Sequence, residues 1–143
     1  VTREEAKKRI FSWLYNPNAE DEELSRLYDR EAVKEMFWDG KSVKTMFHRE
    51  IPSDEYHSLN YIIQSTCSDL IMDRAVAINE MLEGKKTKIA FIIHDSIVLD
   101  YSDEDGDCVN SVYREFMTTP LGRFRTNVSG GRNFGEMKDL WIY

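Results

Sequence analysis

Apolar residues recur every three to four positions over three long stretches of the chain, which is the spacing of a helix with one face on a core. The first predicted helix, Thr2–Tyr15, ends before Pro17, because a residue that precedes proline is pushed out of the helical region. The second is Asp21–Phe37, with acidic residues in its first turn, where the helix dipole favours them. The third and longest is Asn60–Leu82, closed by Gly84.

Two short apolar runs follow the longest predicted helix, and each has the composition of a buried β-strand. They are Ile89–Ile93 and Ile97–Tyr101, and only His94, Asp95 and Ser96 separate them. Two β-rich runs around a tight polar turn predict an antiparallel hairpin with Asp95 at its tip. We expect this hairpin to pack on the helix Asn60–Leu82.

The remaining pattern mixes short elements. A helix is predicted over Glu104–Met117, a short strand near Phe124–Val128, and a turn at the pair Gly130 and Gly131. The segment Lys41–Pro52 fits neither period. Helices and antiparallel strands in one chain predict an α+β fold.

One stripe of the first predicted helix combines cations with aromatic rings. Steps of four residues place Arg3, Lys7, Phe11 and Tyr15 along one side, drifting about 40° per step at 3.6 residues per turn. Two cations followed by two rings would suit a nucleotide, whose phosphates take the cations and whose sugar and base take the rings. The structural alternative is a solvated helix with two aromatic side chains that reach into the core.

Two further sets of polar residues could carry chemistry. Asp95, beside His94 at the hairpin tip, could bind a phosphate-associated Mg²⁺, a cation that prefers oxygen ligands. Asp is also a favoured turn residue that hydrogen-bonds its own backbone. Asn60 and Gln64 lie four residues apart, where their amides could contact base edges and sugars or could form an ordinary polar first turn.

Composition sets broad limits on the function. The 143 residues are 41% hydrophobic and 31% charged, which is typical of one globular domain. Cys67 and Cys108 have no metal-site spacing, so we expect a reducing cytoplasm, or the host cytoplasm if the source is a phage. No stretch has the length and apolarity of a membrane span, so no membrane partner is expected. The net charge of −7 is unusual for a nucleic-acid-binding domain, although the residues Arg3–Arg9 and Arg123–Arg132 are locally basic.

Taken in order, these segments resemble the conserved blocks of family A DNA polymerases, the class of bacterial DNA polymerase I and many phage replicases. Arg3–Tyr15 is similar to the fingers helix of motif B, R-x3-K-x3-F-x3-Y. Asn60–Asp69 resembles the N-x3-Q-G-T-x2-D helix of the palm, and Phe91–Asp95 resembles motif C. Gly130–Phe134 is similar to the glycine turn and aromatic residue near the family's C-terminus. The resemblance implies a palm subdomain, 53–143, preceded by a shortened fingers region, 1–52.

The resemblance also implies roles for the candidate residues. The family transfers nucleotides with two Mg²⁺ ions, and Asp95 would be one of two aspartates that hold them. Arg3 and Lys7 would bind the triphosphate of the incoming dNTP, with Lys7 also placed to protonate the leaving pyrophosphate. Phe11 would pack on the nucleotide sugar. The residues that would contact the primer-template DNA are Tyr15, which would lie by the template base, and Asn60, Gln64 and His94.

The sequence departs from the family pattern at several positions. Asn16 and Ser65 stand where the family has glycine, and Ser96 replaces the glutamate of motif C. No counterpart of motif A, which holds the second aspartate, is found. Asp100 is no substitute, since five residues of strand put it roughly 16 Å from Asp95. We therefore expect catalysis to need an upstream segment that carries motif A, from the same protein or a split subunit, and the chain to be inactive alone.

Two other functions compete with this interpretation. One is a non-catalytic module derived from a palm, which would bind DNA or a protein partner. The other is a metal-dependent phosphohydrolase that uses His94, Asp95 and Asp100, which the distance between the two aspartates disfavours.

Overall fold

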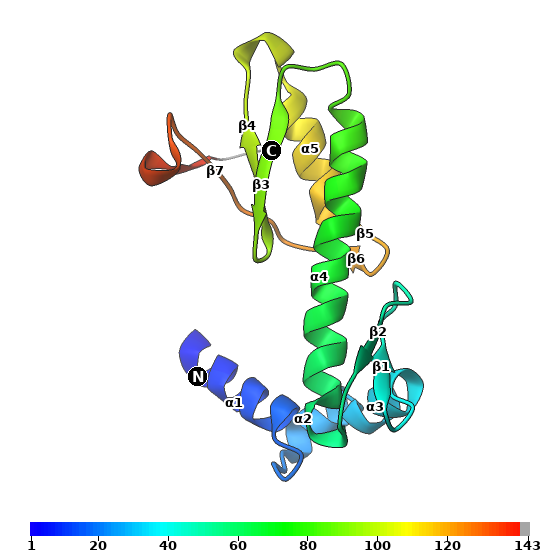
Figure 1. Ribbon diagram of the computed structural model, residues 1–143. Helices are drawn as coiled ribbons and strands as arrows, with labels where there is room; N and C mark the ends of the chain where they lie inside the picture. The colour runs from blue at the N-terminus through cyan, green and yellow to red at the C-terminus, as the bar shows by residue number, and fades with distance from the viewer. Residues whose placement is uncertain (141–143) are drawn as a thin grey trace. The chain divides into compact units, whose positions relative to one another are not determined.

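The structure of the protein is a computed structural model, and residues 1–140 are described. It is a mixed α and β structure with small antiparallel sheets, as the sequence predicts (Figure 1). The helices are α1 (Arg3–Tyr15), α2 (Glu22–Leu27), α3 (Arg30–Phe37), α4 (Glu55–Met81) and α5 (Cys108–Met117), with 3₁₀ turns at Asp103–Asp105 and Phe134–Glu136. The strands are β1 (Ser42–Lys44), β2 (Glu50–Pro52), β3 (Lys88–Ile93), β4 (Ser96–Asp100), β5 (Thr118–Thr119), β6 (Gly122–Arg123), β7 (Val128–Gly130) and β8 (Lys138–Leu140).

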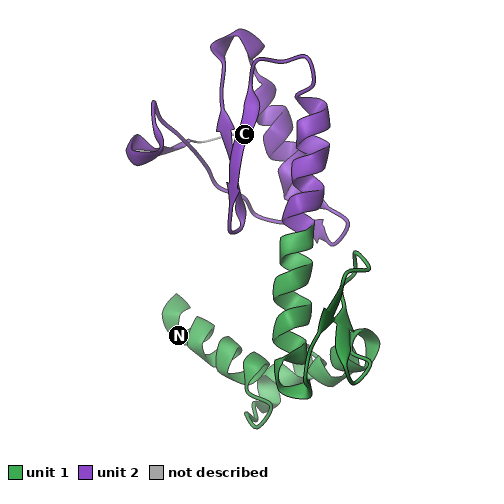
Figure 2. Ribbon diagram, in the orientation of Figure 1, with its two compact units in different colours: residues 1–69 green, residues 70–143 purple. Residues whose placement is uncertain are grey.

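The chain divides into two compact units, coloured separately in Figure 2. Unit 1 is Val1–Asp69, and unit 2 begins at Leu70. The division falls inside α4, so the first turns of this helix belong to unit 1 and the last turns to unit 2. The division into fingers (1–52) and palm (53–143) follows functional segments and stays a prediction.

In unit 1, helix α1 begins with a capping box. The Thr2 hydroxyl accepts a hydrogen bond from the Glu5 amide, and the Glu5 carboxylate accepts one from the Thr2 amide. These bonds satisfy two of the amides that a helix start leaves without partners. The core of the unit contains Trp13, Leu24 and Val43, together with Leu59 and Ile62 from the start of α4.

The predicted single helix over Asp21–Phe37 is wrong, because the chain forms two helices there. Tyr28 adopts extended backbone angles and ends α2. Asp29 then begins a new helix, since its carboxylate accepts a hydrogen bond from the Ala32 amide in the manner of an N-cap. The apolar spacing continues across this break, which explains why periodicity alone predicts one helix.

The hairpin predicted in unit 2 is confirmed. Strands β3 and β4 pair antiparallel, with Ile93 opposite Ser96 next to the turn and Lys88 opposite Asp100 at the far end. One face of the hairpin packs on the last turns of α4 and on α5. The core there consists of the buried Ile78, Leu82, Cys108 and Val112, with the partly buried Ile89, Ile97, Leu99, Val109 and Phe116 around it.

Two other predicted segments change in the structure, and one segment without a prediction forms strands. The helix predicted from Glu104 begins at Cys108, because Gly106, with φ of 59°, interrupts it after a 3₁₀ turn. The strand predicted near Phe124–Val128 is irregular up to Val128, where β7 begins. The ambiguous segment Lys41–Pro52 contains the short hairpin β1–β2.

Substitution Ile78→Ala should destabilise unit 2 by roughly 2–5 kcal/mol, because it leaves a cavity where no part of the side chain is exposed. Val76→Ala is the matched control, since Val76 lies on the same helix with 57% of its surface exposed. It should change stability by less than about 0.5 kcal/mol. Urea unfolding followed by circular dichroism measures both, and equal losses would contradict this packing.

Candidate functional site

The stripe of cations and rings predicted on the first helix is present on α1. The Nζ atom of Lys7 lies 5.7 Å from the centre of the Phe11 ring, and the rings of Phe11 and Tyr15 are 5.7 Å apart. Phe11 is 47% exposed, so it does not serve as a core residue within the part of the chain that the structure describes. The structure thus brings together Lys7, Phe11 and Tyr15 on one line, with Arg3 in the first turn of the same helix.

The cations on this stripe differ from their neighbour Arg9, which is held by carboxylates. The Arg9 guanidinium lies 2.5 Å from Asp21 and 2.8 Å from Glu23. This pairing, with the hydrogen bonds that Arg9 donates as the main cause, lowers the pKa of Asp21 to about 2. Among residues 1–140, no carboxylate lies within 4.0 Å of Arg3 or Lys7. These two side chains are therefore available to an anion.

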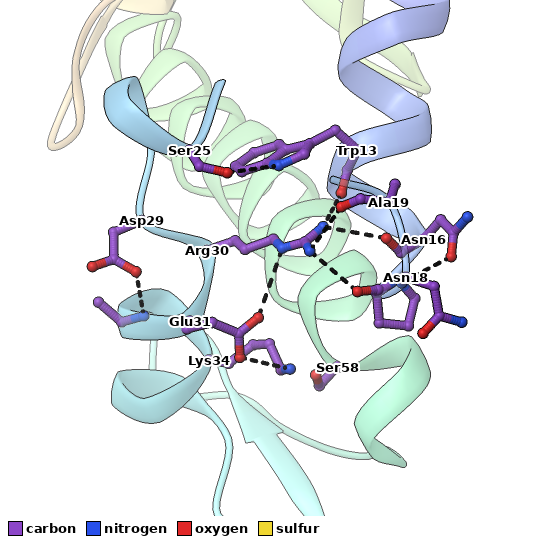
Figure 3. Close-up of polar contacts among 12 residues, drawn as sticks. Trp13, Asn16, Asn18, Ala19, Ser25, Asp29, Arg30, Glu31, Lys34 and Ser58 are labelled. Atoms are coloured by element: carbon purple, nitrogen blue, oxygen red, sulfur yellow. Dashed lines mark hydrogen bonds and ion pairs between the residues drawn. The ribbon is translucent and has the colours of Figure 1, made fainter. Parts of the chain in front are cut away.

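Helix α1 is anchored at its C-terminal end by Arg30, the first residue of α3 (Figure 3). The guanidinium donates to the carbonyl oxygens of Trp13, Asn16, Pro17 and Ala19, the last at 3.1 Å. A helix leaves its final carbonyls without partners, and α1 has no basic residue in its last turn. Arg30 supplies the missing donor and places a positive charge where the helix dipole is negative.

The same guanidinium also packs against an aromatic ring. Its central carbon lies 5.0 Å from the centre of the buried Trp13 side chain, and the Trp13 ring nitrogen donates to the Ser25 hydroxyl at 3.2 Å. The Arg30 side chain is only 16% exposed. Trp13 and Arg30 thus fix the inner side of α1. Within unit 1, Arg3, Lys7 and Phe11 stay exposed, while Tyr15 is partly buried. Burial, reinforced by the nearby Cys67, raises the pKa of Tyr15 at the end of that stripe.

The predicted primer-template residues Asn60 and Gln64 lie on α4, four residues apart, within unit 1. Gln64 is exposed, whereas the side-chain oxygen of Asn60 is buried without a hydrogen-bond partner in the described residues. A buried amide oxygen without a partner carries a desolvation cost. The Gln64 side chain is accessible to a ligand, whereas Asn60 is only partly accessible.

An ion pair holds the β1–β2 hairpin against this part of α4. Asp69 accepts hydrogen bonds from the Thr45 hydroxyl and from Arg49, both at 2.7 Å. A second nitrogen of Arg49 donates to the carbonyl oxygen of Ser65, one residue beyond Gln64. The resemblance aligns Asp69 with a polymerase motif. The sequence does not indicate its partners Thr45 and Arg49, because both come from the segment whose pattern is ambiguous.

Asp95 lies at the tip of the β3–β4 hairpin, as predicted, with its carboxylate exposed. The turn places His94 in the left-handed region, with φ of 51°. The Ser96 hydroxyl donates to the Ile93 carbonyl oxygen at 2.9 Å and closes the turn. Asp100 is at the opposite end of β4, opposite Lys88, so these two aspartates cannot share a metal ion.

The predicted Mg²⁺ site depends on Asp95. Within residues 1–140, no three His, Cys, Asp or Glu side chains lie close enough together to hold a metal ion. Asp95 could supply one ligand, but two ions need further carboxylates or phosphates. The candidate residues also fall in both units, with the α1 stripe, Asn60 and Gln64 in unit 1 and with His94 and Asp95 in unit 2.

No protein-family model matches this chain, and no curated protein or solved structure is significantly similar to it. Over the residues that the structure covers, we find no helix with the length and apolarity needed to cross a membrane. The choice of a function therefore depends on the residues and their geometry.

Replacing Arg30 should loosen the C-terminal end of α1. Arg30→Ala removes the donor to four carbonyls and should cost roughly 2–4 kcal/mol of stability, whereas Arg30→Lys should recover part of this through its charge. Hydrogen exchange of the amides between Asn16 and Ala19 should accelerate in the alanine variant. Arg26→Ala is the control, since that side chain is 81% exposed. Equal effects at Arg26 and Arg30 would contradict the anchoring role.

Proposed function

We propose that this chain is the C-terminal fingers and palm portion of a family A DNA polymerase. In this role it would act on primer-template DNA and a dNTP, together with an upstream segment that carries motif A. The observation that supports the proposal most is the stripe on α1, in which the exposed Lys7 and Phe11 and the partly buried Tyr15 follow one another at contact distance. The exposed carboxylate of Asp95 at a hairpin tip is the second support.

Different residues of the α1 stripe would contact different parts of a nucleoside triphosphate. Arg3 and Lys7, near the helix N-terminus, would bind the phosphates, where the helix dipole also favours negative charge. Phe11 would pack on the sugar, and Tyr15, held at the anchored end of the helix, would border the template base. The charged and aromatic side chains of the stripe would thus provide one contact for each part of a nucleotide.

Two side chains of this chain would take part in nucleotide transfer. Lys7 could donate a proton to the departing pyrophosphate, since an ammonium group beside a phosphate is both charge partner and acid. Asp95 would contribute one ligand to the Mg²⁺ pair of the assembled enzyme. The remaining ligands would come from motif A and from the substrate, so the proposal assigns no catalytic step to this chain alone.

The second candidate is a non-catalytic module that retains the palm architecture and binds DNA or a protein. The replacement of the family glutamate by Ser96 and the single exposed carboxylate at the tip favour it. The two candidates differ in one outcome: only the polymerase should extend a primer when the motif A segment is supplied.

Primer extension by the reconstituted enzyme tests this difference. The chain alone should be inactive, and activity should arise when it is fused to, or mixed with, an upstream family A segment that contains motif A. Asp95→Asn should abolish this activity, because the variant loses the ligand charge. Asp100→Asn, at the far end of the same strand, should retain it. Robust extension by the isolated chain, or an inactive reconstituted mixture, would contradict the proposal.

Lys7→Ala should lower the rate of nucleotide incorporation by roughly 10²–10³-fold, the usual loss when a group that stabilises developing charge is removed. Primer-template binding should change less than about twofold, because the contact is made to the triphosphate. Lys8→Ala is the matched control, since Lys8 is adjacent but off the stripe. Equal losses of incorporation and DNA binding in Lys7→Ala would make Lys7 a general electrostatic contact.

A further inference from the structure

The ten arginines of the chain fall into two groups of equal size. Within residues 1–140, five have a carboxylate within 4.0 Å, namely Arg9, Arg26, Arg30, Arg49 and Arg74. The other five have none, and three of those lie close together in sequence, namely Arg123, Arg125 and Arg132. The chain carries more acidic than basic residues, so composition alone does not predict a local group of arginines without carboxylate partners.

These three arginines belong to the C-terminal arm, defined here as residues 118–140. The arm contains four basic and two acidic side chains, so it is positive while the whole chain has a net charge of −7. One of the two acids, Glu136, accepts a hydrogen bond from Asn133 at 3.0 Å instead of pairing with Arg132. The arm is thus a local positive surface on an acidic protein.

The arm has a paired backbone on either side of Arg132, whereas Arg125 lies in an irregular segment. Strands β7 and β8 pair antiparallel, with Gly130 opposite Lys138. A Cβ atom at Gly130 would lie 2.8 Å from the Leu140 side chain, and one at Gly131 would collide with the carbonyl oxygen of Glu136. The two glycines therefore permit a tight return of the chain, and Arg132 follows directly after it.

Aromatic rings alternate with these cations. Phe124 lies between Arg123 and Arg125 and is 48% exposed, and Phe134 follows Arg132 and is 58% exposed. The Phe134 ring meets the ring of Phe91 edge to face at 5.5 Å, which connects the arm to the β3–β4 hairpin. One groove in unit 2 is lined by Arg125, Arg132 and the rings of Phe91 and Phe134. The acidic residues Asp95, Asp100, Asp103 and Asp107 line it as well, so the cations occupy only the part of the groove that the arm forms.

We infer that the C-terminal arm binds a single nucleic-acid strand. Arg123, Arg125 and Arg132 contact phosphates of this strand, and the exposed ring of Phe134 stacks with a base. Cations that track a backbone, interleaved with rings that accept any base, are the usual means of binding a single strand without sequence preference.

This inference deepens the proposed function, because the strand would be part of the primer-template DNA. It assigns contacts to residues outside the motifs on which the proposed function depends. Binding needs neither Mg²⁺ nor motif A, so the two ideas can fail separately. If the arm binds DNA but the chain never supports primer extension, this inference stands and the polymerase proposal fails.

The test is fluorescence anisotropy of a fluorescein-labelled 20-nucleotide single strand, titrated with the 143-residue chain between 50 and 200 mM salt. Replacing Arg123, Arg125 and Arg132 together by Gln should weaken binding roughly tenfold or more. It should also reduce the slope of log K against log salt by about 2, the value for three lost phosphate contacts on a single strand. Replacing the same three residues by Lys should preserve the slope.

The matched control replaces Arg26, Lys41 and Lys44 by Gln, which removes the same charge from exposed positions in unit 1. It should leave the slope unchanged. Phe134→Leu should weaken binding roughly 5- to 100-fold at every salt concentration without altering the slope, because stacking releases no counterions. Phe134→Tyr should restore it. Circular dichroism of each variant verifies that the fold is retained.

Three results would overturn the inference. Equal losses in the arm and control triple variants would mean that only net charge matters. Unchanged binding in the arm variant would place the strand elsewhere. Displacement of the oligonucleotide by poly-glutamate at equal charge, with no effect of Phe134→Leu, would instead identify an acidic protein as the partner.

Discussion

The arrangement of unit 1 depends on one partly buried guanidinium. Arg30 begins α3, yet its hydrogen bonds go to the end of α1 and to the loop that follows. A neutral donor could satisfy one or two of those carbonyls, but only a guanidinium can donate to four and also lie against the face of Trp13. Because this anchoring uses the inner side of α1, the other side can carry Lys7 and Phe11 in an accessible position. The candidate site on α1 is therefore a consequence of how the helix is held.

Helix α4 is the second constraint, because its residues enter both cores. Leu59 and Ile62 are buried in unit 1, while Ile78 and Leu82 are buried in unit 2. The apolar positions shift around the helix along its 27 residues, so it has no single apolar face. This shift suits a helix whose two ends pack against different elements.

Much of the secondary structure could be predicted from the sequence. The helix α1 and the β3–β4 hairpin follow from periodicity and from the polar turn at Asp95, since both are local in sequence. The break at Tyr28 could not be predicted from periodicity, because the apolar spacing continues through it and the capping by Asp29 decides the outcome. The partners of Arg30 and Asp69 could not be predicted either. They are 11 to 24 residues away in sequence, and only the tertiary fold brings them together.

The β3–β4 hairpin has a further consequence for handling the protein. Within the described residues it is a two-stranded sheet, so the outer edge of each strand presents amides and carbonyls without strand partners. Strand β3 also leaves Phe91 and Ile93 about two-fifths exposed, in a run of five apolar residues without charge or proline. Such a segment readily pairs with a copy of itself. Partial unfolding of unit 2 should therefore favour self-association, and Lys88 at the start of the strand is the one charge within β3 that opposes it.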